Sequence, residues 1–259
     1  MRIVAVSFLN TRPLIYGLEA ASGVALRLEV PSKLAGLLEA HQADACLLPV
    51  IDLCRCRTTP LVLPAGCIAS AGQTFTVRVF SRVQPERIDR IWADTDSHTS
   101  VALAQVLWRG RYGRTLEVLP LPVPPKALPA EAQAVLLIGD KVVTAPPAWP
   151  VQLDLGQLWQ EMTALPFVFA VWAASKAADA PGLHQVLDQA RRAGQDRLEE
   201  IAAHYGPLHG WPVELARRYL TVNLQFDFTS AHQAGMEEFL RRAAELCLVN
   251  PWPLSYFSW

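Results

Sequence analysis

The sequence predicts an α/β fold of two lobes with a helical C-terminal tail. Short β-branched runs alternate with helical segments over the first fifty residues, a second alternating series follows, and the chain from about Pro181 onward is mostly helical. Strands and helices in alternation are typical of parallel sheets with right-handed crossovers. A chain of 259 residues can form one large domain or two modest ones.

The first series has the order β-α-β-α-β. Strands are predicted at residues 3–7, 26–30 and 45–48. Thr11 is a suitable N-cap for a helix over residues 12–21, with Pro13 near its first position, where a missing N–H costs nothing. Ser32 caps a second helix that runs to about residue 41 and carries leucines at helical spacing.

The second series lies between residues 75 and 175. Strands are predicted at residues 75–80, 91–93, 134–138 and 167–173, and a helix at residues 98–109. The proline-rich stretch 119–129 must be extended. Helices are then expected at residues 183–205, 213–222 and 232–249.

Two lobes require the chain to cross between them, and we expect crossings near residues 70–74 and 167–175. This assigns residues 1–74 and 176–259 to one lobe and residues 75–175 to the other. Two crossings let lobes hinge around a cleft that holds a ligand.

Composition excludes several classes of protein. Hydrophobic residues make up 51% and charged residues 18%, which excludes disorder as the main state. The 23 basic and 24 acidic residues leave a net charge of -1, so we expect no nucleic-acid partner. The longest apolar run, residues 164–174, is shorter than the roughly 20 residues of a membrane span. The first residues lack the apolar segment of a signal peptide, and we therefore expect a cytoplasmic protein without a membrane partner.

Metal and cofactor motifs are also missing from the sequence. Cys54 and Cys56 have one residue between them and no second pair, and His204 and His209 lack the spacing of a metal site. We expect five reduced, structural cysteines, namely Cys46, Cys54, Cys56, Cys67 and Cys247. No glycine-rich nucleotide loop and no Gly-x-Ser-x-Gly elbow is present, so the sequence gives no support for a bound nucleotide or for a serine nucleophile of that kind.

Polar residues follow several of the predicted strands. Because open α/β sheets bind ligands beyond the carboxyl ends of their strands, these segments are the candidate site. They are residues 7–12, 49–50, 68–70, 96–100 and 139–140.

Each candidate side chain also has a structural interpretation. Ser97, Thr99 and Ser100 lie where a helix N-terminus offers an anion free N–H groups, although capping alone explains part of this pattern. Asn10 and Thr11 have the same two interpretations. The remaining candidates divide as follows: Arg12 is a carboxylate partner or a surface residue, Ser70 a ligand or a turn residue, and Asp140 a cleft carboxylate or a cap.

Residues 6–14 read Val-Ser-Phe-Leu-Asn-Thr-Arg-Pro-Leu, and this block closely resembles the N-terminal signature of the menaquinone-biosynthesis chorismate dehydratases of the futalosine pathway. Further stretches resemble the same family in the same order, at residues 47–50, 68–70, 79–81, 94–103, 136–140 and 165–173. Two positions depart from the family: His98 stands where Arg is more usual, and Ser70-Ala71 precedes Gly72 without the usual acidic residue.

The resemblance implies a fold like that of type II periplasmic binding proteins. It also implies a reaction without cofactor, in which chorismate loses water to give 3-[(1-carboxyvinyl)oxy]benzoate. On this hypothesis Asn10 and Ser70 hold the reacting carboxylate or the leaving hydroxyl. Asp140 is the candidate base, with the substrate's own second carboxylate as its rival. The substrate-binding candidates are Ser7, Thr11, Arg12, Ser97, His98, Thr99 and Ser100.

Two other functions remain open at this point. The first is a small-anion binding protein of the same fold without catalysis, because fold does not settle function. The second is the sister lyase of the same pathway, which releases dihydroxynaphthoate from a cyclic futalosine derivative.

Overall fold

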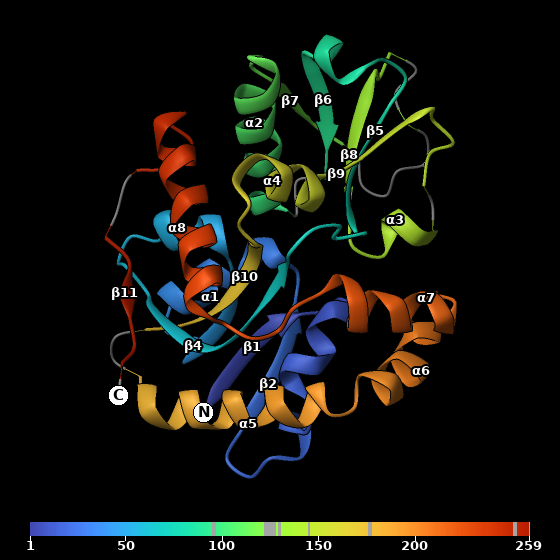
Figure 1. Cartoon of the computed structure of the whole chain (residues 1–259). Coiled ribbons are helices and arrows are strands. Elements are labelled where there is room, and N and C mark those ends of the chain that lie inside the picture. The colour runs from blue at the N-terminus through green and yellow to red at the C-terminus, as the bar shows by residue number, and fades with distance from the viewer. Residues whose placement is uncertain are drawn as a thin grey trace.

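The computed structural model describes residues 1–94, 97–121, 128, 131–144, 146–175, 178–250 and 253–258. Two sheets form two lobes that face each other, as Figure 1 shows. The N-terminus lies in the lower lobe of this view, and the helices after residue 180 also belong to it. The predicted two-lobed α/β class with a helical C-terminal part is therefore confirmed.

The first lobe is built on a six-stranded sheet. Its strands, in spatial order, are β11 (Ser255–Tyr256), β4 (Leu61–Ser70), β10 (Phe167–Ala174), β3 (Ala45–Pro49), β1 (Arg2–Val6) and β2 (Ala25–Glu29). β1 pairs in parallel with β2 and β3, as the β-α-β-α-β order predicts, whereas β10 runs antiparallel to β3 and β4. The helical segments of this lobe are η1 (Leu9–Ile15), η2 (Leu18–Ala20), α1 (Pro31–Glu39), η3 (Val50–Cys54), α5 (Ala180–Gln195), α6 (Leu198–Leu208), α7 (Val213–Arg218), η5 (Tyr219–Asn223) and α8 (Ser230–Glu245).

The second lobe is built on a five-stranded sheet. Its strands, in spatial order, are β7 (Glu117–Pro120), β6 (Arg90–Ala93), β8 (Ala134–Ile138), β5 (Val77–Ser81) and β9 (Val151–Asp154). The helices of this lobe are η4 (Pro85–Arg87), α2 (His98–Tyr112), α3 (Lys141–Thr144) and α4 (Leu155–Thr163). Buried apolar side chains from both lobes form one large cluster, so the lobes share their main core.

The predicted helix over residues 12–21 is wrong in kind. The segment forms two short 3-10 helices, η1 and η2, separated at Gly17, whose φ of 78° is left-handed. Pro13 inside η1 removes a backbone donor, and glycine readily adopts the left-handed turn that follows. The short 3-10 geometry matters because η1 carries Asn10.

The second crossing between the lobes also differs from the prediction. We expected it near residues 167–175, but β10 is a central strand of the first sheet, flanked by β3 and β4. The chain therefore returns to the first lobe within residues 164–166, directly after α4. A continuous apolar strand that follows a helix gives no sign of the sheet that it joins, so the sequence did not show which strands would flank β10.

The first crossing, residues 71–76, is held by one buried carboxylate. Asp154 Oδ1 accepts from the backbone N–H of Thr74 (2.9 Å), and Oδ2 accepts from that of Phe75 (2.6 Å). The same carboxylate caps α4 by accepting from Gly156 N and Gln157 N. Phe75 has a φ of 74°, which is strained for a bulky residue and persists only where its surroundings fix it. Asp154 thus fixes the connection and the start of α4 together.

Replacing this carboxylate should destabilise the fold more than losing an ordinary cap. Asp154→Ala leaves buried N–H groups without acceptors, and we expect it to lower the free energy of unfolding by about 2–4 kcal/mol. Asp179→Ala is the matched control, because Asp179 caps α5 through a single exposed bond to Gly182 N; we expect it to cost about 1 kcal/mol. Urea unfolding followed by circular dichroism measures both. Equal losses would contradict the role given to Asp154.

Candidate functional site

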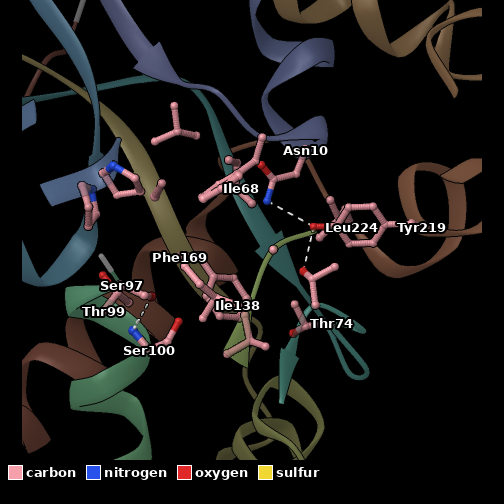
Figure 2. Close-up of a pocket in the computed structure, with 18 residues that line it drawn as sticks. Asn10, Ile68, Thr74, Ser97, Thr99, Ser100, Ile138, Phe169, Tyr219 and Leu224 are labelled. Atoms are coloured by element: carbon pink, nitrogen blue, oxygen red, sulfur yellow. Dashed lines mark hydrogen bonds between the residues drawn. The ribbon is translucent and has the colours of Figure 1, made fainter. Parts of the chain in front are cut away.

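A cavity lies between the lobes at the ends of their strands, and it contains about 600 Å³ of space including its open mouth. Figure 2 shows Asn10 and Tyr219 on one side of it, Ser97, Thr99 and Ser100 on another, and Phe169 and Ile138 between them. The lining residues are Val6, Phe8, Asn10, Pro31, Pro49, Ile68, Thr74, Thr76, Val77, Ser97, Thr99, Ser100, Ile138, Gly139, Phe169, Ala170, Tyr219 and Leu224.

The lining has apolar walls and two polar ends. Phe8, Ile68, Ile138, Phe169 and Leu224 supply large apolar surfaces, while the hydroxyl and amide groups gather at the ends. No lysine, arginine, aspartate or glutamate is among the described lining residues. The cavity therefore offers neutral donors and acceptors around an apolar middle.

The first polar end is the N-terminus of α2. Ser97 is its N-cap, and Ser97 Oγ accepts from Ser100 N at 3.4 Å. Thr99 Oγ1 accepts from Ile51 N of the opposite lobe at 3.3 Å, which leaves the Thr99 hydroxyl hydrogen available to donate elsewhere. Ser97 therefore caps the helix and also lines the cavity. Thr99 and Ser100 line the cavity in the first turn of the helix, where the helix dipole favours an anion.

The second polar end is centred on Asn10. Its amide Nδ2 donates to the Tyr219 hydroxyl at 3.1 Å, and Thr11 Oγ1 lies 3.5 Å from its Oδ1. The Tyr219 hydroxyl is also 2.8 Å from Thr76 Oγ1. Asn10 comes from the first lobe and Thr76 from the end of the crossing that leads into the second, so this end of the cavity is assembled where the two lobes join.

Four of the predicted binding residues are not among the lining residues, namely Ser7, Thr11, Arg12 and His98. Ser7 is exposed, and Thr11 is completely buried behind Asn10. The Arg12 guanidinium lies 4.3 Å from the ring centre of Tyr205 and 3.6 Å from Glu19. These contacts favour the structural interpretation of Thr11 and Arg12.

His98 and Ser70 make contacts within the protein. His98 Nδ1 is 2.9 Å from each carboxylate oxygen of Asp52, a buried residue of η3 in the opposite lobe. Ser70 is fully buried at the end of β4, and its hydroxyl is 2.8 Å from that of Thr74. His98 therefore links the lobes, and Ser70 supports Thr74, which does line the cavity.

Asp140 is a second link between the lobes. Its Oδ1 accepts from Trp211 Nε1 at 2.7 Å, and its Oδ2 is 2.9 Å from His209 Nδ1. Both partners follow α6 in the first lobe, whereas Asp140 follows β8 in the second. Its neighbour Gly139 lines the cavity but Asp140 does not. Both carboxylate oxygens are thus used between the lobes.

Sequence reasoning missed Tyr219, Thr74 and Thr76. Tyr219 is far from Asn10 in the chain and sits in a segment whose pattern indicated only a helix. The alternation around Thr74 and Thr76 indicated a strand, and its position at the expected crossing was the available signal that these hydroxyls face a cleft.

None of the five cysteines forms a disulfide, and four of them are buried. Burial raises the pKa of Cys46 and of Cys56 to about 12, so these thiols stay protonated. Within the described residues, no three His, Cys, Asp or Glu side chains form a group that could hold a metal ion. Nor does any helix in the described ranges have the length and apolar character needed to cross a membrane.

Two α/β lobes around a cleft at their strand ends define a periplasmic-binding-protein-like fold, and comparison with solved structures agrees. A protein of Archaeoglobus fulgidus matches with a TM-score of 0.74 at 14% identity, covering 96% of this chain and 98% of that one. The periplasmic aliphatic sulphonate binding protein of Escherichia coli matches with a TM-score of 0.67 at 12% identity, covering 100% and 93%.

The sequence places the chain within one family of this fold. The family model described as menaquinone biosynthesis matches residues 1–245, and the chain belongs to that family. The chorismate dehydratase of Thermus thermophilus is 30% identical over an alignment that covers 88% of this chain and 94% of that protein. The resemblance seen in the N-terminal block is thereby confirmed.

The contacts of Asp140 predict a measurable effect on stability. Asp140→Ala leaves the buried Trp211 N–H without its acceptor, and we expect the free energy of unfolding to fall by about 1–3 kcal/mol. Asp140→Asn keeps one acceptor oxygen for that N–H and should cost less than about 1 kcal/mol. Urea unfolding compares the two. An alanine variant as stable as the wild type would show that this contact contributes little.

Proposed function

We propose that this chain dehydrates chorismate to 3-[(1-carboxyvinyl)oxy]benzoate, the reaction of the futalosine route to menaquinone. The observation that supports this most directly is a cleft with two neutral polar ends and apolar walls in a chain related to a chorismate dehydratase. We also propose that the reaction needs no cofactor. A cytoplasmic location and the lack of a nucleic-acid or membrane partner stay predictions.

The shape and polarity of the cavity suit a doubly charged ring acid. Chorismate carries one carboxylate on its ring and another on its enolpyruvyl side chain. The α2 N-terminus with Thr99 and Ser100 would bind one carboxylate, and Asn10 with its neighbours the other. Phe8 and Phe169 would cover the ring between them.

The chemistry requires stabilisation of charge more than a strong base. The proton is lost from the ring carbon that carries the enolpyruvyl ether, and the electron pair of that C–H bond moves through the ring double bond onto the ring carboxylate. Fixed donors stabilise this charge better than water, which would have to reorganise. The hydroxyl group on the adjacent ring carbon then leaves, takes up the proton as water, and the ring becomes aromatic.

The contacts of Asp140 bear on which group accepts the proton. Its two oxygens are hydrogen-bonded to Trp211 and His209, and it does not line the cavity. Since a general base must reach the proton it removes, this placement favours the rival hypothesis. We therefore propose that the substrate's enolpyruvyl carboxylate accepts the proton.

Turnover of chorismate tests the proposed function. The wild-type protein should produce the benzoate ether, followed by aromatic absorbance and chromatography. Asn10→Ala removes a fixed donor and should lower kcat by about 100-fold, the usual effect of losing one such group. Asn250→Ala, at an exposed position outside the cavity, is the control and should not change kcat. An unchanged rate in Asn10→Ala would remove Asn10 from the site.

Asp140→Asn tests the choice of base. Loss of a general base costs about 100-fold to 10,000-fold in rate, so we expect this variant to keep more than a tenth of the wild-type rate. A loss above about 100-fold, with the stability of the variant unchanged, would restore Asp140 as the base. Chorismate that is bound but not converted would favour a binding protein, and release of dihydroxynaphthoate from the cyclic futalosine derivative would favour the sister lyase.

A further inference from the structure

Tyr219 occupies an unusual position at the Asn10 end of the cavity. It is 1% exposed and is the first residue of η5, a π-helical turn. Such turns are rare in proteins and occur frequently at functional sites. Its ring stacks on that of Trp211 at 4.9 Å with an interplanar angle of 23°, and the ring of Phe75 lies 6.5 Å away. The packing fixes the ring and therefore the place of its hydroxyl.

The Tyr219 hydroxyl holds the Asn10 amide in one orientation. It accepts from Asn10 Nδ2 at 3.1 Å, so one amide hydrogen is directed at the tyrosine and the other remains for the cavity, which Asn10 lines. The last torsion of an asparagine side chain is otherwise broad, so the amide would rotate without this partner. Burial raises the pKa of Tyr219, so the hydroxyl remains neutral and keeps its proton.

The second partner of the hydroxyl connects this orientation to the second lobe. Thr76 Oγ1 is 2.8 Å from the Tyr219 hydroxyl, and the Thr76 carbonyl accepts from Gly139 N of the second lobe at 2.9 Å. Thr76 is thereby fixed to the second lobe. The row Asn10–Tyr219–Thr76 therefore joins two residues of the first lobe to a residue held by the second, and Figure 2 shows the hydrogen bond between Asn10 and Tyr219.

We propose that Tyr219 is a positioning residue, which orients the Asn10 amide for the reaction. It acts through Asn10 and not on the substrate. This inference rests on the proposed dehydration and deepens it, because it assigns to the C-terminal helical part a role in the chemistry of the N-terminal block.

A double-mutant cycle tests whether Tyr219 acts through Asn10. Tyr219→Phe keeps the ring and removes only the hydroxyl, and we expect kcat for chorismate to fall about tenfold, with KM changed less than about twofold. In the Asn10→Ala background the same change should have no further effect, because residues that act as a unit are not additive. Tyr256→Phe is the matched control: its hydroxyl donates to Glu237 at 2.8 Å, at β11, outside the cavity, and kcat should not change.

Two results of this cycle would overturn the proposal. One is an unchanged kcat in Tyr219→Phe. The other is a tenfold fall that persists in the Asn10→Ala background, since Tyr219 would then act on the substrate directly. If Tyr219→Phe does not fold, Thr76→Val removes the hydroxyl at the other end of the row. It should lower kcat only while Asn10 is present, and additive effects would again contradict the proposal.

A measurement without substrate separates this inference from the proposed function. The side-chain amide of Asn10 can be assigned by NMR from the signal that Asn10→Ala loses. In the wild type, the shifts of its two hydrogens should differ from those of a free asparagine amide and their exchange with water should be slow, and in Tyr219→Phe both properties should move toward the values of a free amide. If the wild type does not convert chorismate, the proposed function fails and so does the kinetic role of Tyr219. An amide that is equally ordered in both proteins would disprove the positioning itself.

Discussion

Contact between the two lobes at each polar end of the cavity is the constraint on which the site depends. At the α2 end, buried Asp52 of the first lobe meets His98 of the second. At the Asn10 end, Asp140 of the second lobe accepts from Trp211, whose ring stacks on Tyr219. Because each pair sits directly beside lining residues, the contacts that hold the two lobes together also hold the polar groups at both ends of the cavity in place.

The neutral lining also fits the proposed reaction on energetic grounds. Neutral donors at fixed positions would interact more strongly with the charge that moves onto the ring carboxylate in the transition state than with the bound substrate, and only such a difference raises the rate. The charged side chains near the cavity are used for lobe contacts, where each has a partner and its burial is compensated.

The sequence was sufficient for the fold class and for the segments that approach the cavity. Each candidate segment after a strand contributes at least one lining residue, such as Phe8, Pro49, Ile68, Thr99 and Gly139. This follows from a property of sheets, since strand ends of one sheet lie together whatever their side chains. The family resemblance was likewise readable from one short block. The sequence did not show which sheet β10 joins or that Asn10 pairs with Tyr219, because both depend on contacts between distant parts of the chain.

The sequence also did not show which residue of each segment lines the cavity and which contacts the opposite lobe. A strand end that faces a cleft between two lobes needs polar residues for two reasons, to bind the ligand and to contact the opposite lobe. Hydroxyl, imidazole and carboxylate side chains suit either purpose. The sequence therefore does not distinguish Thr99, which lines the cavity, from His98, which pairs with Asp52. In the same way, Gly139 lines the cavity whereas Asp140 contacts the opposite lobe. Whether such a residue binds the ligand or contacts the opposite lobe depends on the residues that face it across the cleft. For Asp140 these residues lie in the turn after α6, about seventy residues further along the chain.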